Sequence, residues 1–200
     1  HQRGEAGVAR AQTAVRRPSR AGRLRALGDA LRAVEAHRRV AHAVGADDPL
    51  AALPYAFTGA GLVAAGRTEE ALSAFEDAFA IEPNHTLALW GAGMANVALG
   101  QVDEGIARIE RSVEVTRRAP HFVGVLGWAL AVAGRADEAT AVLRELRARP
   151  PAAPTVVAEG WLLGALGDTD AAFDVFSRAA DEQHAMLYYI GLPAFDALRD

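Results

Sequence analysis

The chain contains no cysteine, so histidine, serine and the acidic residues are the main side chains that could act as bases, nucleophiles or metal ligands. The Asp and Glu residues recur at capping positions and are expected to be solvated helix starts. His37 and His42 are five residues apart, so they do not stack on one helical face as metal ligands at i and i+4 would. No serine lies in the Gly-x-Ser-x-Gly turn of a hydrolase. His121 has no carboxylate at a fixed neighbouring offset that could orient it as a base. We therefore expect no catalytic residue, no metal site and no cofactor.

The segment GAGLVAAG, which starts at Gly59, has a glycine spacing similar to that of a dinucleotide-binding loop. Such a loop follows a β-strand, and no strand pattern precedes Gly59. A repeat along the chain explains these glycines instead, so we reject a nucleotide-binding loop.

Arginines are concentrated at the start of the chain, where residues 1–50 carry ten of them against five acidic residues. Residues 51–200 carry eleven arginines against twenty acidic residues, and the chain has no lysine. The first 24 residues contain no Phe, Tyr or Trp ring that could stack on a base, so any attraction to phosphates would be nonspecific and sensitive to salt. Nucleic acid is therefore expected as a partner only through these arginines.

The composition is typical of an all-α protein, since Ala, Leu, Arg and Glu dominate and no alternating β pattern occurs. No apolar run is long enough to span a membrane, and no signal peptide is visible. We expect a cytoplasmic protein.

One short pattern returns along the chain in steps of 34, 34 and 33 residues. Its centre is a turn glycine at Gly66, Gly100, Gly134 and Gly167. Seven residues earlier stands another glycine: Gly59, Gly93, Gly127 and Gly160. Five residues later stands a small residue: Ala71, Gly105, Ala139 and Ala172. Small side chains are needed where two helices cross closely, so each unit is predicted to be a helical hairpin, with an A helix before the turn and a B helix after it.

The B helices are predicted to bury one face with a 3.6-residue period. Its residues are Ala71, Phe75, Ala78 and Phe79 in the first unit, Ala139, Leu143 and Leu146 in the third, and Ala172, Phe176 and Ala179 in the fourth. Acidic residues at the start of each B helix stabilise its N-terminus. Prolines at 49, 83 and 151 end the B helices before the next unit begins.

The period, the glycine–alanine pair and the terminal proline resemble the tetratricopeptide repeat (TPR) family over residues 52–186, although Arg117 replaces one proline. The resemblance implies a right-handed superhelix, an α-solenoid, of four to five hairpins. The expected organisation is a basic, partly disordered lead-in (1–21), a degenerate leading repeat (22–51), four repeats (52–85, 86–119, 120–152, 153–186) and a tail (187–200). The tail, from Tyr189 to Leu198, is similar to that of TPR arrays in bacterial multidomain regulators.

The resemblance also implies a concave groove lined by the A helices, in which all three tryptophans of the chain lie. The basic and asparagine side chains with which some members of the family grip a carboxylate are absent. The expected groove residues are Leu53, Val63, Leu87, Trp90, Met94, Val97, His121, Trp128, Val132, Val157 and Trp161.

These observations favour a protein-interaction scaffold or adaptor whose groove binds an apolar or amphipathic segment of a protein or peptide. Three other classes stay open: self-association into a homo-oligomer, a regulatory or sensory domain of a signalling or nucleic-acid-associated protein, and a sensor that binds a small apolar ligand. The groove tryptophans could also pack on neighbouring helices or under the chain termini, without binding a partner.

Overall fold

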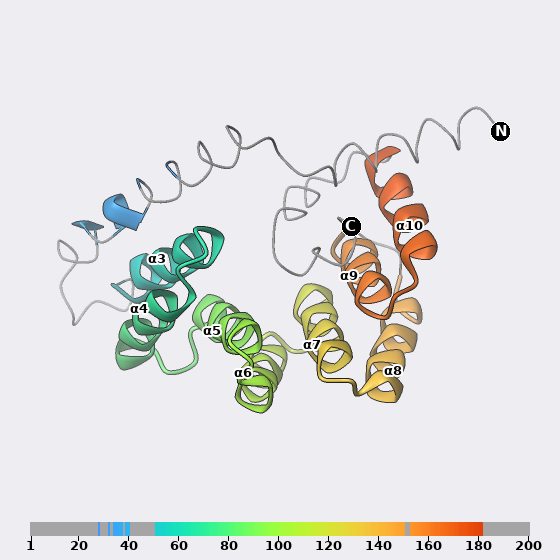
Figure 1. Cartoon of the computed structure of the whole chain (residues 1–200), viewed down its shortest axis with the longest axis horizontal. Helices are drawn as coiled ribbons and strands as arrows, with labels where there is room; N and C mark the ends of the chain where they lie inside the picture. Colours follow the sequence, from blue (N-terminus) through green and yellow to red (C-terminus); the bar gives the residue numbers. More distant parts are fainter. Residues whose placement is uncertain are drawn as a thin grey trace. The chain divides into compact units, whose positions relative to one another are not determined.

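A computed structural model describes residues 28, 32, 34–37, 39–40, 51–150 and 153–181 of the chain. All regular secondary structure within these residues is helical, which confirms the predicted all-α fold (Figure 1). The predicted lead-in and tail lie outside the described residues, as does most of the predicted leading repeat.

Eight helices between residues 52 and 181 pack as four hairpins, and each hairpin lies within one of the predicted units. Helices α3 to α6 belong to one compact unit and α7 to α10 to another, with the boundary between Arg117 and Arg118. The hairpins are α3 (Ala52–Ala64) with α4 (Thr68–Ile81), α5 (Thr86–Ala98) with α6 (Val102–Val115), α7 (Pro120–Val132) with α8 (Ala136–Arg147), and α9 (Ala153–Ala165) with α10 (Thr169–Asp181).

The turn glycines recur because each one ends an A helix in the same way. The backbone N–H of Gly66 donates to the carbonyl of Val63 at 3.0 Å, and that of Arg67 donates to Leu62 at 2.9 Å. This pair of bonds is a Schellman cap, which requires a positive φ at the glycine. The same two bonds form at Gly100, Gly134 and Gly167, whose φ angles lie between 74° and 84°.

The B helices begin with acidic residues in their first turn, as predicted. The B helix α4 ends at Ile81, two residues before Pro83. The B helix α6 has no such proline, and after it Arg117 and Arg118 adopt φ angles of 52° and 60°. Two left-handed residues in a row cannot continue a right-handed helix, so they terminate α6 in place of the proline.

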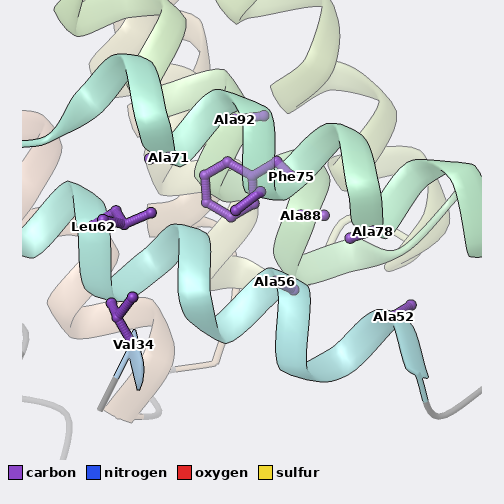
Figure 2. Packing of buried hydrophobic residues seen from close by; sticks show 10 residues of the cluster. Val34, Ala52, Ala56, Leu62, Ala71, Phe75, Ala78, Ala88 and Ala92 are labelled. Carbon is purple, nitrogen blue, oxygen red and sulfur yellow. The ribbon is translucent and has the colours of Figure 1, made fainter. Parts of the chain in front are cut away.

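The core of the first hairpin is built around the ring of Phe75 from α4 (Figure 2). A Cβ atom at Gly59 of α3 would lie 2.5 Å from this ring, and one at Gly91 of α5 would also collide with it. Two glycines on neighbouring A helices therefore make room for one aromatic ring. Val34 joins this core from the leading helical residues, on the side of α3 away from α4 (Figure 2).

The prediction that paired small residues mark a helix crossing is confirmed most directly in the second hairpin. A Cβ at Gly93 would lie 3.0 Å from the carbonyl oxygen of Gly105, so the two backbones touch. In the first and fourth hairpins the glycine faces a phenylalanine ring instead, Phe75 or Phe176. Nine of the ten predicted apolar B-helix residues are buried: Ala71, Phe75, Ala78, Ala139, Leu143, Leu146, Ala172, Phe176 and Ala179. The tenth, Phe79, is half-buried and packs against the core of the first hairpin.

Candidate functional site

The candidate site consists of side chains from the A helices. These helices are almost free of charged residues, most of which lie on the B helices. Helices α3, α5 and α7 contain no Asp, Glu, Lys or Arg, and α9 contains only Glu159. Ten consecutive residues of α5, Ala88 to Val97, are buried, as are the eight from Val123 to Leu130 in α7. A helix that is apolar all round is typically covered on most of its faces, and this is the case for α5 and α7.

In the unit that contains α3 to α6, the predicted groove residues differ in exposure. Leu53 is exposed, at the start of α3, and Val63 and Leu87 are half-buried. The remaining three, Trp90, Met94 and Val97, lie on α5 and are buried. Helices α3 and α5 pack side by side, which places these residues on neighbouring A helices.

In the unit that contains α7 to α10, His121 and Trp161 are in direct contact. Their ring centroids lie 4.9 Å apart at an interplanar angle of 61°, an edge-to-face arrangement that joins α7 to α9. Trp128, Val157 and Trp161 are buried, whereas Val132 at the end of α7 is half exposed. The two helices approach closely because a Cβ at Gly124 would lie 2.5 Å from the Cβ of Ala158.

His121 is half-buried, and this burial lowers the pKa of its imidazole to about 4. The side chain is therefore uncharged at neutral pH, which suits its place against an indole ring. A neutral histidine of this kind contributes packing to the A-helix face and no positive charge.

Comparison with known families and structures supports the architecture read from the repeats. Residues 62–126 match a model of the tetratricopeptide repeat. This part of the chain therefore contains tetratricopeptide repeats. Its fold is similar to that in a crystal structure of YrrB, described as a TPR protein with an unusual peptide-binding site. The TM-score is 0.52 and the identity 20%, over 79% of this chain and 81% of that chain. No curated protein matches the chain.

The tryptophans of the TPR hairpins are buried side chains in this structure, with Trp90 and Trp128 each 8% exposed and Trp161 only 1%. Of the predicted groove residues, Leu53 and Val132 are the exposed ones, with Val63, Leu87 and His121 intermediate. Within each unit these are the predicted groove residues that a partner could contact without rearrangement: Leu53, Val63 and Leu87 in the first, His121 and Val132 in the second. That all eleven residues bind a partner stays a prediction.

Two features of the TPR array were missed from the sequence. Phe57 on α3 is an exposed aromatic residue, although it is not among the positions that the family resemblance implies.

The second feature is a cluster of Arg118, Glu145 and Arg149 after α6. Arg118 pairs with Glu145, and Arg149 binds both Glu145 and the carbonyl of Arg118. The hydrogen bond from Arg118 lowers the pKa of Glu145. No sequence signal relates Arg118 to residues about thirty positions later.

Other polar groups of the TPR hairpins stabilise the packing of neighbouring B helices. Arg108 of α6 binds Glu76 of α4 at 2.8 Å and Glu104 at 2.9 Å, and its guanidinium lies 5.5 Å from the centre of the Phe79 ring.

Within the described residues, no three His, Asp or Glu side chains gather as metal ligands. In the same part of the chain, no helix is long and apolar enough to cross a membrane.

Proposed function

We propose that this TPR array is a protein-interaction scaffold that binds an apolar or amphipathic segment of a protein or peptide along its A helices. The observation that carries the proposal is the near absence of charge from these helices, where Glu159 is the single acidic residue and no Lys or Arg occurs. A charged ligand would lose its hydration on such a surface without gaining an ion pair. The surface therefore favours ligands with apolar side chains.

Leu87 of α5 and Val132 of α7 are the contact residues on which the proposal is best tested. Leu87 is half-buried and Val132 is exposed, so each can be contacted within its own unit without unfolding a hairpin. The buried Trp90, Met94, Trp128 and Trp161 would support this surface from within. The peptide-binding site named for YrrB, which shares the fold, supports a peptide as the class of ligand.

A more specific role, as the adaptor or sensory part of a bacterial regulator, rests on the tail from Tyr189 to Leu198. This tail lies outside the described residues. The adaptor role therefore remains an expectation from sequence, whereas peptide binding has support from the A helices themselves.

The test is a selection of peptides from a random display library on the full chain, followed by fluorescence polarisation with the selected peptides. We expect apolar or amphipathic sequences to be selected. Val132→Glu and Leu87→Glu should each weaken their binding at least about tenfold, which corresponds to about 1.4 kcal/mol.

The matched control is Val115→Glu, which changes an exposed valine near the end of the B helix α6. This variant should bind the selected peptides as the native chain does. Selection of strongly charged peptides, or equal weakening by Val115→Glu and Val132→Glu, would contradict the proposal. Circular dichroism confirms that the variants are equally helical.

A further inference from the structure

Helix α9 packs on the described helices α7, α8 and α10 through three of its faces. Ala158 and Leu162 meet the glycines of α7. Glu159 pairs with an arginine of α8 at 2.8 Å, and Gly160 faces a phenylalanine ring of α10. An α-helix turns by about 100° per residue, so Trp161 lies about 200° around the axis from Glu159, on the side away from α8.

This side of α9 is nevertheless buried. Trp161 is 1% exposed, and Val157, one turn earlier on the same side, is 0% exposed. The edge of the His121 ring touches Trp161, and that ring is itself half-buried. A tryptophan has about 150–250 Å² of surface to bury, so one imidazole leaves most of it to be covered by other residues of the chain.

The segment that follows α10, residues 182–200, has the composition to cover Val157 and Trp161. Six consecutive residues, 185–190, are apolar, and Leu192, Phe195 and Leu198 follow them. Apolar side chains of this kind gain free energy when they leave water against an uncharged surface. We call residues 182–200 the C-terminal segment.

The C-terminal segment starts close enough to reach Trp161. Helices α9 and α10 form a hairpin of two 13-residue helices, so the end of α10 at Asp181 lies beside the start of α9 at Ala153. Trp161 is eight residues further along α9, about 12 Å at a rise of 1.5 Å per residue. About four extended residues span this distance, which brings residues 185–190 to the level of Trp161.

The start of the chain is less suited to cover this side of α9. Residues 1–27 contain seven arginines and no Phe, Tyr or Trp. A guanidinium buried against Val157 would need an acidic partner. The single acidic residue of the helix, Glu159, is already paired with Arg147. Charge therefore favours the C-terminal segment as the cover.

We propose that the C-terminal segment folds back along α9 and covers Val157 and Trp161 with its apolar side chains. The A-helix surface of the last hairpin is then filled by the chain itself, and Trp161 becomes accessible to another molecule only when the segment is displaced. The inference does not rest on the proposed peptide binding, because a contact within the chain forms whether or not a peptide binds at Leu87 or Val132.

Photo-cross-linking from a single cysteine tests the proposal in the full chain, which has no cysteine of its own. Ala165→Cys places the label one turn after Trp161 on the same side of α9, at a half-buried position. A benzophenone attached there should cross-link to residues 182–200 of the same chain, identified by digestion and mass spectrometry. The matched control is Ala141→Cys, at an exposed position of α8, which should give no such product. Products from Ala165→Cys that contain no part of the C-terminal segment, or that join two copies of the chain, would overturn the proposal.

Quenching of tryptophan fluorescence by acrylamide measures the cover directly. In a chain with Trp90→Phe and Trp128→Phe, Trp161 is the only remaining tryptophan. Adding Leu192→Glu with Phe195→Glu should raise its quenching constant at least about threefold, because the new charges disfavour burial of the segment against α9. Quenching that stays at the level of the parent chain would contradict the proposal.

Two controls separate displacement of the C-terminal segment from a general loosening of the fold. Val8→Glu with Val15→Glu makes the matched change at the start of the chain and should leave the quenching of Trp161 unchanged. A synthetic peptide of residues 182–200, added to the variant with the altered segment, should restore the shielding of Trp161. Equal exposure of Trp161 by both pairs of substitutions, or no effect of the peptide, would count against the proposed contact.

Discussion

At the scale of single residues, His121 illustrates how a polar side chain becomes part of an apolar helix face. It stands in the first turn of α7, where its ring meets Trp161 of α9 at 4.9 Å. Burial at this position favours the neutral imidazole, because the cation would lose part of its hydration. The position therefore links the packing of two A helices to pH.

The folded protein should lose stability on acidification through His121. Its folded-state pKa of about 4 lies below the ordinary value of 6.5, so the unfolded chain binds a proton first as the pH falls. The stabilising contribution is complete above pH 6.5 and is lost toward pH 4. Between pH 7.5 and 5 we expect the native chain to lose about 2 kcal/mol more than His121→Leu, measured by urea denaturation.

The difference between the native chain and His121→Leu removes the contribution of the other histidines, which both proteins share. The chosen pH range also avoids the titration of Glu138 and Glu145, because the pKa values of both carboxyl groups are lowered. Parallel stability curves for the two proteins over this range would show that the imidazole is not buried as described.

At the scale of helices, glycine decides how closely neighbouring elements approach. Gly59 of α3 and Gly91 of α5 both face the ring of Phe75, so three helices meet around one side chain. Adding a methyl group at Gly59 improves the helix propensity of α3 but forces the ring to move. Steric crowding should dominate, since a Cβ at 2.5 Å from a ring atom cannot be accommodated without a shift.

Gly59→Ala should therefore destabilise the protein by about 1–3 kcal/mol. Combining it with Phe75→Leu should cost less than the sum of the two single changes by at least about 1 kcal/mol, because the smaller side chain leaves space for the new methyl group. Chemical denaturation of the four proteins in the cycle gives this coupling.

The matched control uses Phe176 of α10, which faces Gly160 in the same way as Phe75 faces Gly59. Gly59→Ala and Phe176→Leu change different hairpins, so their effects should add. Equal coupling of Gly59 to both phenylalanines would argue against a local steric origin.

At the scale of the whole molecule, a repeat array is stabilised by contacts between successive elements. Helix α4 packs on α3 and α5, and α9 packs on α7, α8 and α10. In such an array the loss of one core side chain acts first on its immediate neighbours.

Phe75→Ala should reveal this locality, because removal of a buried phenylalanine costs about 3–5 kcal/mol. Hydrogen–deuterium exchange followed by mass spectrometry should show faster exchange in α3, α4 and α5. The amides of α8, α9 and α10 should keep their native rates. A uniform increase in exchange along the whole chain would instead indicate that the described helices unfold as one cooperative unit.

The sequence by itself determined the features that depend on local geometry. The Schellman caps at Gly66, Gly100, Gly134 and Gly167 need a positive φ, which glycine adopts without the steric cost that other residues bear. The buried faces of the B helices follow from the 3.6-residue period, so Ala71, Phe75 and Ala78 could be predicted as core residues. Hairpins, turns and most of the core were therefore readable from spacing alone.

Only the tertiary structure decided which A-helix side chains are accessible, since accessibility depends on how closely separate helices approach. Trp161 is buried where Gly124 and Ala158 bring α7 and α9 together, whereas Phe57 remains exposed at the edge of α3. A helical period identifies the side of a helix on which a residue lies. It does not state what covers that side, because the covering residues come from elements distant in the chain.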